Sequence, residues 1–366
     1  MSFAGLDAGR LPSPCHVVDV AKLEDNLRIL ADIAGRADVN VLLALKAFSC
    51  FAVADLIGEY LDGTAASGLW EARLGRRCFS GEVHTFAPGL KADHLAEVEQ
   101  LSDHLIFNTI GQWRRFAPAL ARDGRCGYGI RLNPRHSEVE NPLYDPCAAW
   151  SRLGTTAREL AGADLGGLSG LHVHGLCDQG YEPFDRMLAA IEDVAGDLLG
   201  HMDWINLGGG QLLTAPYYPV DRLVGRLTDF RRRTGLSVYL EPGTAVALEA
   251  GALVAEVLDT GRNEGHFAVL DASATCHMPD VIEARYTPGI LGAEIVPAGE
   301  AAADDPCVVR LGGPTCLAGD VIGTYRFPLP PEVGDRVVIL DQAYYTMVKA
   351  TTFNGTPRPA IALWDS

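Results

Sequence analysis

Lys46 is the first residue in the chain whose position suggests chemistry. It directly follows the apolar run at residues 41–45. A lysine at the end of a buried strand is partly desolvated, which lowers its pKa, and the neutral amine can form a Schiff base. The alternative interpretation is a lysine whose stem packs at a strand end while its ammonium group reaches solvent.

Two histidines form the next candidate. His172 and His174 are two residues apart, so they point to the same face of a strand. We interpret them as imidazoles that lie against a flat cofactor. With Cys177 they also suggest zinc, but no fourth ligand follows at a suitable spacing, and we therefore predict no metal site.

Three glycines and a glutamate end two later apolar runs. Gly208, Gly209 and Gly210 follow Asn206, and their N–H groups can surround a phosphate, although a plain turn is the alternative. The pattern is not G-x-G-x-x-G, so it does not support a Rossmann dinucleotide site. Glu241 can pair with a protonated ring nitrogen and keep that ring cationic, as an electron sink; a surface turn is the alternative.

These residues need a scaffold that gathers strand ends. Through about residue 245, apolar runs alternate with helix-like segments, and the candidates lie where the runs end. Eight or nine such repeats predict an α/β fold, a parallel (β/α)8 TIM-type barrel whose carboxyl-terminal rim carries the site; a doubly wound sheet is the second choice. The runs are residues 16–20, 39–45, 63–67, 83–86, 104–107, 129–132, 170–174, 204–207 and 238–240.

The pattern of predicted secondary structure changes after residue 245. Short β-rich runs separated by Gly and Pro replace the alternation, which predicts a second, mostly antiparallel β domain. We therefore expect a barrel over residues 12–245 and a C-terminal β domain over residues 246–366, with residues 1–11 packing against the latter.

Composition narrows the class of protein. The chain has 366 residues, with 47 acidic and 30 basic side chains and a formal net charge of −17. This charge disfavours nucleic acid and anionic membranes as partners and favours a cationic small substrate. Nine scattered cysteines without a C-x-x-C pair predict reduced thiols in a cytoplasmic protein. We see neither a signal peptide nor an apolar stretch long enough to span a bilayer.

Four segments together resemble one family. The chain is similar to the fold-type III pyridoxal phosphate decarboxylases, the group of ornithine and diaminopimelate decarboxylase and, more distantly, alanine racemase. Within it, the motifs are most similar to those of the carboxynorspermidine/carboxyspermidine decarboxylases. The segments are residues 44–49, 271–280, 311–320 and 345–355.

The resemblance implies pyridoxal 5'-phosphate as the cofactor and assigns roles by position. Lys46 matches the lysine that holds the cofactor covalently, and His172 matches the histidine that stacks on its ring. Glu241 matches the acid that keeps the ring nitrogen protonated. The remaining cofactor-binding matches are Arg131, Gly209, Gly210 and Tyr345.

The resemblance also implies the reaction, which is the decarboxylation of carboxynorspermidine or carboxyspermidine to norspermidine or spermidine in polyamine biosynthesis. Cys316 matches a cysteine that is donated across a homodimer interface and protonates the decarboxylated intermediate. Asp280 matches a carboxylate that binds the polyamine substrate, with Asp271 and Asp320 as further acidic candidates.

Two positions depart from the family pattern. Thr244 follows Glu-Pro-Gly where the family has a second glutamate, and Arg285 stands in a segment where the family has Met-Pro. Both changes lower the local negative charge, so they can alter substrate choice. A decarboxylase or racemase of another diamino acid is therefore the alternative function. A non-catalytic cofactor carrier and a zinc enzyme are weaker alternatives.

Overall fold

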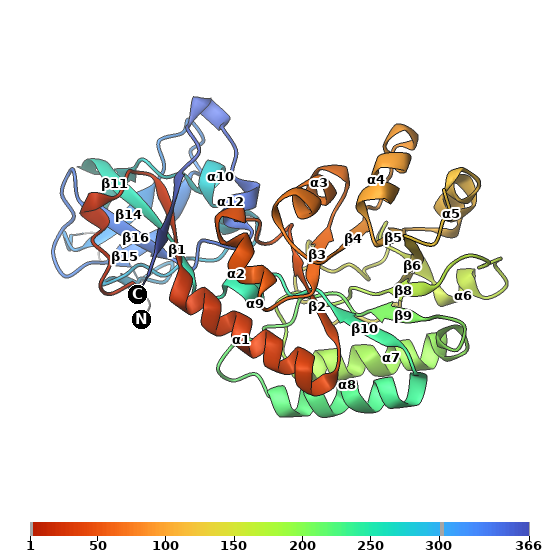
Figure 1. Ribbon diagram of the computed structural model, residues 1–366. Helices are drawn as coiled ribbons and strands as arrows, with labels where there is room; N and C mark the ends of the chain where they lie inside the picture. The colour runs from red at the N-terminus through yellow and green to blue at the C-terminus, as the bar shows by residue number, and fades with distance from the viewer. Residues whose placement is uncertain (1–2, 301–303, 366) are drawn as a thin grey trace. The chain divides into compact units, whose positions relative to one another are not determined.

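The computed structural model describes residues 3–300 and 304–365. The described chain divides into two compact units. One unit is Glu24–Val246, called here the barrel unit. The residues before and after it form the other, called the sheet unit (Figure 1).

The barrel unit contains eight parallel strands in a closed ring. The order of hydrogen-bonded neighbours is β5-β4-β3-β2-β10-β9-β8-β6, and pairing of β5 with β6 closes the ring. The predicted barrel is therefore confirmed. The strands are β2 (Asn40–Ala44), β3 (Gly63–Ala66), β4 (Glu82–Phe86), β5 (His104–Phe107), β6 (Gly127–Asn133), β8 (Gly170–His172), β9 (Trp204–Asn206) and β10 (Ser237–Leu240), and the two-residue β7 (Thr155–Thr156) pairs with β6 outside the ring.

Helices cover the outside of this ring. Helix α8 shows how sequence dictates one of them: its buried side chains, Leu223, Leu227 and Phe230, recur at helical spacing, and Gly235 ends it with a φ of +73°. Figure 1 shows α7 and α8 side by side. The helices of this unit are α2 (Ala54–Gly58), α3 (Leu69–Cys78), α4 (Leu95–Leu101), α5 (Ile110–Phe116), α6 (Ala157–Leu160), α7 (Tyr181–Leu199) and α8 (Val220–Thr234), while α1 (Val20–Ala37) and α9 (Thr244–Ala247) cross its boundaries.

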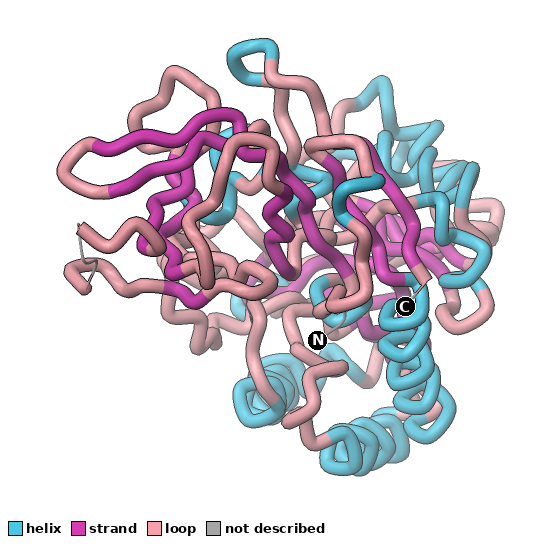
Figure 2. The backbone as a smooth tube through the Cα atoms, turned by 90° about the vertical axis from the view of Figure 1, so that its left-hand side faces the viewer, coloured by secondary structure: helices cyan, strands magenta, loops and turns pink. Residues whose placement is uncertain are grey.

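The sheet unit is built on a mostly antiparallel sheet. Its order is β13-β15-β14-β12-β11-β1-β17, with β16 also on β11; only β1–β17 and β12–β14 are parallel. Figure 2 shows these strands joined by long loops and short helices. The strands are β1 (Cys15–Asp19), β11 (Gly251–Arg262), β12 (His266–Leu270), β13 (Glu294–Ile295), β14 (Val308–Gly312), β15 (Val321–Arg326), β16 (Arg336–Leu340) and β17 (Ala360–Trp364), and the helices are α10 (Ala274–His277), α11 (Pro279–Glu283) and α12 (Thr346–Lys349).

The placement of β1 differs from the expectation. The sequence analysis counted residues 16–20 among the barrel repeats, but β1 pairs with β11 and β17. All five of its residues are buried, as in a barrel strand, so the apolar pattern alone could not reveal its partners.

Two further features bear on the class of protein. No helix of the described ranges, residues 3–300 and 304–365, is long and apolar enough to cross a membrane. All nine cysteines are free thiols.

Candidate active site

A cavity lies at the carboxyl ends of the barrel strands, where the sequence analysis expected a site. Its lining gathers side chains from six different strands or the loops that follow them. The polar and aromatic members are Lys46, Ser67, Phe86, Arg131, His172, His174 and Glu241. The structure therefore brings together four of the predicted cofactor-binding residues, which are Lys46, Arg131, His172 and Glu241.

Lys46 occupies the turn that follows β2. Burial lowers the pKa of its ammonium group, the Glu241 carboxylate opposes that effect, and the nearby Arg131 guanidinium reinforces it. A lysine in this environment yields its neutral amine at lower pH than a surface lysine does. This is the property that covalent attachment to a carbonyl requires.

Glu241 is held by two neighbours at the end of β10. The Asn206 side-chain amide donates a 2.7 Å hydrogen bond to Glu241 Oε1, and His172 Nε2 lies 3.6 Å from Glu241 Oε2. Burial alone would raise the pKa of Glu241, but His172 and Lys46 outweigh it and lower the pKa to about 2. The site therefore holds a permanent carboxylate that can keep a proton on a ring nitrogen.

The His172 imidazole lies in a stack of flat groups. The centroids of the His172 and Phe86 rings are 5.3 Å apart, and the angle between the ring planes is 15°. The Arg131 guanidinium lies over the Phe86 ring, with its central carbon 4.6 Å from the ring centroid. Arg131 Nη2 also donates to the His174 carbonyl at 3.2 Å. Burial lowers the pKa of His172, so the imidazole is neutral at physiological pH.

Glycines 208–210 allow three strand ends to approach closely. A Cβ on Gly209 would lie 2.0 Å from the Glu241 carbonyl oxygen, and one on Gly210, at φ +87°, would lie 2.2 Å from the Leu176 carbonyl oxygen. The Gly209 N–H donates to His174 Nδ1 at 3.1 Å. Close backbone packing thus requires glycine here, and phosphate binding by Gly209 and Gly210 stays a prediction.

The His174 contact also bears on the zinc alternative. His174 Nδ1 is occupied by the Gly209 N–H. Among the residues that the structure describes, His172, His174 and Cys177 do not gather three ligand atoms at one point. The cavity geometry therefore does not favour a zinc enzyme built on these residues.

Thr244 reveals a carboxylate that the sequence analysis missed. Its hydroxyl donates to Asp178 Oδ1 at 2.9 Å. Asp178, in the loop after β8, is exposed and has a φ of +48°. Asp178 thus places a carboxylate directly beside Thr244. Only the contact between this loop and the start of α9 identifies Asp178, since 66 residues separate it from Thr244.

The six remaining predicted residues all lie in the sheet unit. Cys316 is exposed in the loop between β14 and β15, and its N–H donates to Asn354 Oδ1 at 3.2 Å. Asp320 is 4% exposed and accepts hydrogen bonds from Ser273 and Thr315, so it anchors that loop. Asp271 accepts from the Glu256 N–H at 2.8 Å. Tyr345 precedes α12 with a φ of +50°.

Asp280 and Arg285 complete the set. Asp280 lies in the first turn of α11 and binds Lys349 Nζ at 2.6 Å. Lys349 also binds Glu283. Arg285 is exposed, with a φ of +57°. The cation that contacts Asp280 is therefore Lys349, and it affects the charge around Asp280 more than Arg285 does.

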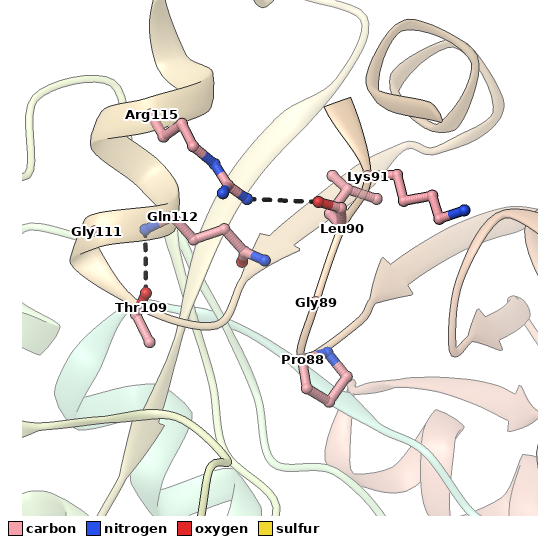
Figure 3. Close-up of a pocket in the computed structure, with 8 residues that line it drawn as sticks. All are labelled: Pro88, Gly89, Leu90, Lys91, Thr109, Gly111, Gln112 and Arg115. Atoms are coloured by element: carbon pink, nitrogen blue, oxygen red, sulfur yellow. Dashed lines mark hydrogen bonds between the residues drawn. The ribbon is translucent and has the colours of Figure 1, made fainter. Parts of the chain in front are cut away.

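A second hollow lies on the outside of the barrel unit. Its volume is about 470 Å³, and its lining includes Lys91 and Arg115 beside the Thr109–Gln112 hydrogen bond (Figure 3). Arg115 donates to the Leu90 carbonyl at 3.4 Å. This surface hollow contains none of the predicted site residues.

The fold and the cavity define a barrel enzyme with a buried amine, a permanent carboxylate and a stacked imidazole. A family model described as "Pyridoxal-dependent decarboxylase, C-terminal sheet domain" matches residues 15–343. The chain belongs to this family of pyridoxal-dependent decarboxylases.

Individual relatives agree. A carboxynorspermidine/carboxyspermidine decarboxylase of Campylobacter jejuni is 37% identical, with 97% of this chain and 94% of that protein covered. A carboxyaminopropylagmatine decarboxylase of Synechocystis is 40% identical, with 96% and 89% covered. The crystal structure of the carboxynorspermidine decarboxylase of C. jejuni complexed with norspermidine matches with a TM-score of 0.88 at 36% identity, covering 97% of this chain and 95% of that one. The chain is a pyridoxal phosphate-dependent decarboxylase.

The residues of the cavity fit this cofactor. Lys46 supplies the amine for its aldehyde, Glu241 supplies the carboxylate for its ring nitrogen, and His172 supplies a flat neutral ring. His172 Nδ1 is buried and lacks a hydrogen-bond partner, so the protein leaves one polar atom of the cavity unsatisfied.

Proposed function

We propose that this decarboxylase acts on a carboxylated polyamine, carboxynorspermidine or carboxyspermidine, and releases norspermidine or spermidine. The observation that carries the proposal is the buried Lys46–Glu241–His172 arrangement within a chain whose relatives act on such compounds. The structure that carries norspermidine is also among its structural neighbours.

The bound cofactor supplies an electron sink for the carbanion that loss of carbon dioxide leaves. Lys46 offers the neutral amine that attaches it, because burial lowers the pKa of that amine. Glu241, fixed by Asn206, holds a proton at the ring nitrogen. His172 and Phe86 form a flat apolar face that excludes water from the site.

The polyamine tail requires carboxylates. Asp178 stands next to Thr244 at the rim of the barrel and supports binding of one ammonium group. In the sheet unit, Asp280 already binds the ammonium of Lys349, so its surroundings suit an ammonium ion. We propose that Asp178 takes part in substrate binding, and the family resemblance assigns the same role to Asp280. Charge-assisted hydrogen bonds of this kind contribute about 1.5–3 kcal/mol each.

A second candidate substrate is carboxyaminopropylagmatine. The observation that favours it is the 40% identity to the Synechocystis decarboxylase of that compound. Its distal end is a guanidinium group, which pairs with a carboxylate through two parallel hydrogen bonds.

A substrate panel separates these candidates. Purified enzyme with added cofactor is incubated with carboxynorspermidine, carboxyspermidine, carboxyaminopropylagmatine, diaminopimelate, ornithine and lysine, and carbon dioxide and amine products are measured. The proposal expects the highest kcat/KM with the first two compounds. Preference for the third supports the second candidate, and turnover of only the simple amino acids contradicts both.

We also propose a cytoplasmic homodimer in which Cys316 of one subunit completes the site of the other. The exposed position of Cys316 and the nine free thiols support this arrangement. Lys46→Ala and Cys316→Ala subunits, each inactive alone, are mixed under exchanging conditions. Shared sites regenerate one native site per heterodimer and about one quarter of the wild-type activity. No recovery despite proven heterodimers contradicts shared sites.

A further inference from the structure

Three potential metal ligands meet at the opposite end of the barrel from the cofactor cavity. Glu82 is the first residue of β4, His84 follows two residues later on the same face, and His104 is the first residue of β5. The β4–β5 register makes His84 and His104 direct neighbours. None of the three has a part in the proposed decarboxylation.

Their ligand atoms already lie close together. One atom from each of Glu82, His84 and His104 lies within 4.8 Å of the others. His84 Nε2 is 2.9 Å from Glu82 Oε2, and the two imidazole rings are 4.3 Å apart. In a tetrahedral site with bonds of 2.0–2.1 Å, ligand atoms are about 3.3 Å apart. The three ligand atoms therefore lie within about 1.5 Å of the spacing that such a site has.

The nitrogen atoms of this cluster are incompletely satisfied. Nδ1 of His84 and Nδ1 of His104 are both buried without a hydrogen-bond partner, and His84 is only 1% exposed. Buried polar atoms normally have partners, so each imidazole keeps one nitrogen that the protein does not satisfy, while His84 Nε2 faces Glu82. Branched apolar side chains are the usual filling of a barrel interior, so ordinary packing does not explain these histidines.

The surroundings support a metal ion in two ways. The Trp204 ring stacks on the His104 ring, with centroids 4.3 Å apart and an interplanar angle of 3°. The centroids of the Tyr239 and His84 rings are 4.5 Å apart. These contacts hold both imidazoles in place. The Glu82 side chain is 44% exposed, which provides an entry path and room for a water ligand.

We propose that Glu82, His84 and His104 bind a divalent transition-metal ion, with Zn²⁺ as the ion that best suits two imidazoles and one carboxylate. The ion links β4 to β5 at the amino-terminal end of the barrel. Because it lies away from the cofactor cavity, it stabilises the barrel and takes no part in catalysis.

The test uses the cofactor-loaded enzyme after removal of metals with a chelator. Zn²⁺ alone is titrated by calorimetry, bound metal is counted by mass spectrometry, and Tm is measured with and without Zn²⁺. The variants are Glu82→Gln and His104→Phe, which keeps a ring against Trp204. The matched control is His136→Gln, since His136 pairs with Glu138 at the same two-residue spacing without a third ligand.

The wild type and the control are expected to bind one Zn²⁺ per chain that both variants bind at least about a hundredfold more weakly. Zn²⁺ should raise Tm only where that ion binds. The amount of zinc bound by cysteine thiols is expected to be equal in all four proteins, so it does not affect the difference between them. Equal zinc binding by the wild type and Glu82→Gln, or none by the wild type, overturns the proposal. Glu82 is partly exposed, so that variant decides the matter even if His104→Phe does not fold.

Discussion

Replacing Glu241 with glutamine tests the central claim about the cofactor site. The substitution preserves shape and the hydrogen bond from Asn206, because a glutamine oxygen can accept it in place of Glu241 Oε1. It removes the negative charge that faces His172 at 3.6 Å and that opposes the fall in the pKa of Lys46. The expected effect is therefore electrostatic and not one of packing.

The size of the effect follows from the bond that is lost. A carboxylate that holds a protonated ring nitrogen makes a charge-assisted hydrogen bond of about 1.5–3 kcal/mol. Loss of that term from the transition state lowers kcat/KM roughly 10- to 150-fold. In the same variant, the pKa of Lys46 should fall further, so the visible band of the bound cofactor should form at lower pH.

The assay compares steady-state decarboxylation and spectral pH titrations of the wild type and Glu241→Gln. Glu99→Gln is the matched control, because Glu99 is also a buried carboxylate of the barrel unit but hydrogen-bonds Tyr128 and does not line the cavity. The control should keep its kcat/KM. A kcat/KM of Glu241→Gln within about threefold of the wild-type value would refute the assigned role of Glu241.

Three further results are expected. Gly209→Ala should lower stability by about 1–3 kcal/mol in urea unfolding and reduce cofactor binding, since the new Cβ would lie 2.0 Å from the Glu241 carbonyl oxygen; an unchanged midpoint argues against close packing there. Asp178→Asn should raise KM for a polyamine substrate about tenfold with little change in kcat, whereas Thr244→Val should raise it less; equal kinetics in all three proteins would remove Asp178 from the substrate site. The pKa of Glu241, about 2, lies below the usual 4.5, so its stabilising contribution is present above pH 4.5 and is lost as the pH falls toward 2; the wild type should therefore lose more stability than Glu241→Gln between pH 5 and pH 3, and parallel losses would contradict the shift.

The barrel strands could be predicted because strands buried on both faces produce continuous apolar runs. β2, β5 and β10 fall where such runs lie. The same pattern gives no partner, which is why β1 was assigned to the barrel although it pairs with β11.

Site residues could be predicted where a single residue ends a strand. Lys46, His172 and Glu241 are of this kind, and the structure gathers them. Residues that matter through a partner could not be predicted. Asp178 is identified by its contact with the Thr244 hydroxyl. His84 and His104 are identified by the register of β4 and β5, which makes them neighbours.

The net charge of −17 does not by itself supply free carboxylates for a polyamine. Asp280, the carboxylate that the family resemblance points to, already binds Lys349, which Glu283 also contacts. A substrate ammonium that binds Asp280 therefore either displaces this internal ammonium or shares the carboxylate with it. In either case Lys349 offsets part of the electrostatic gain, so discrimination between substrates depends on chain length and hydrogen-bond geometry more than on total charge.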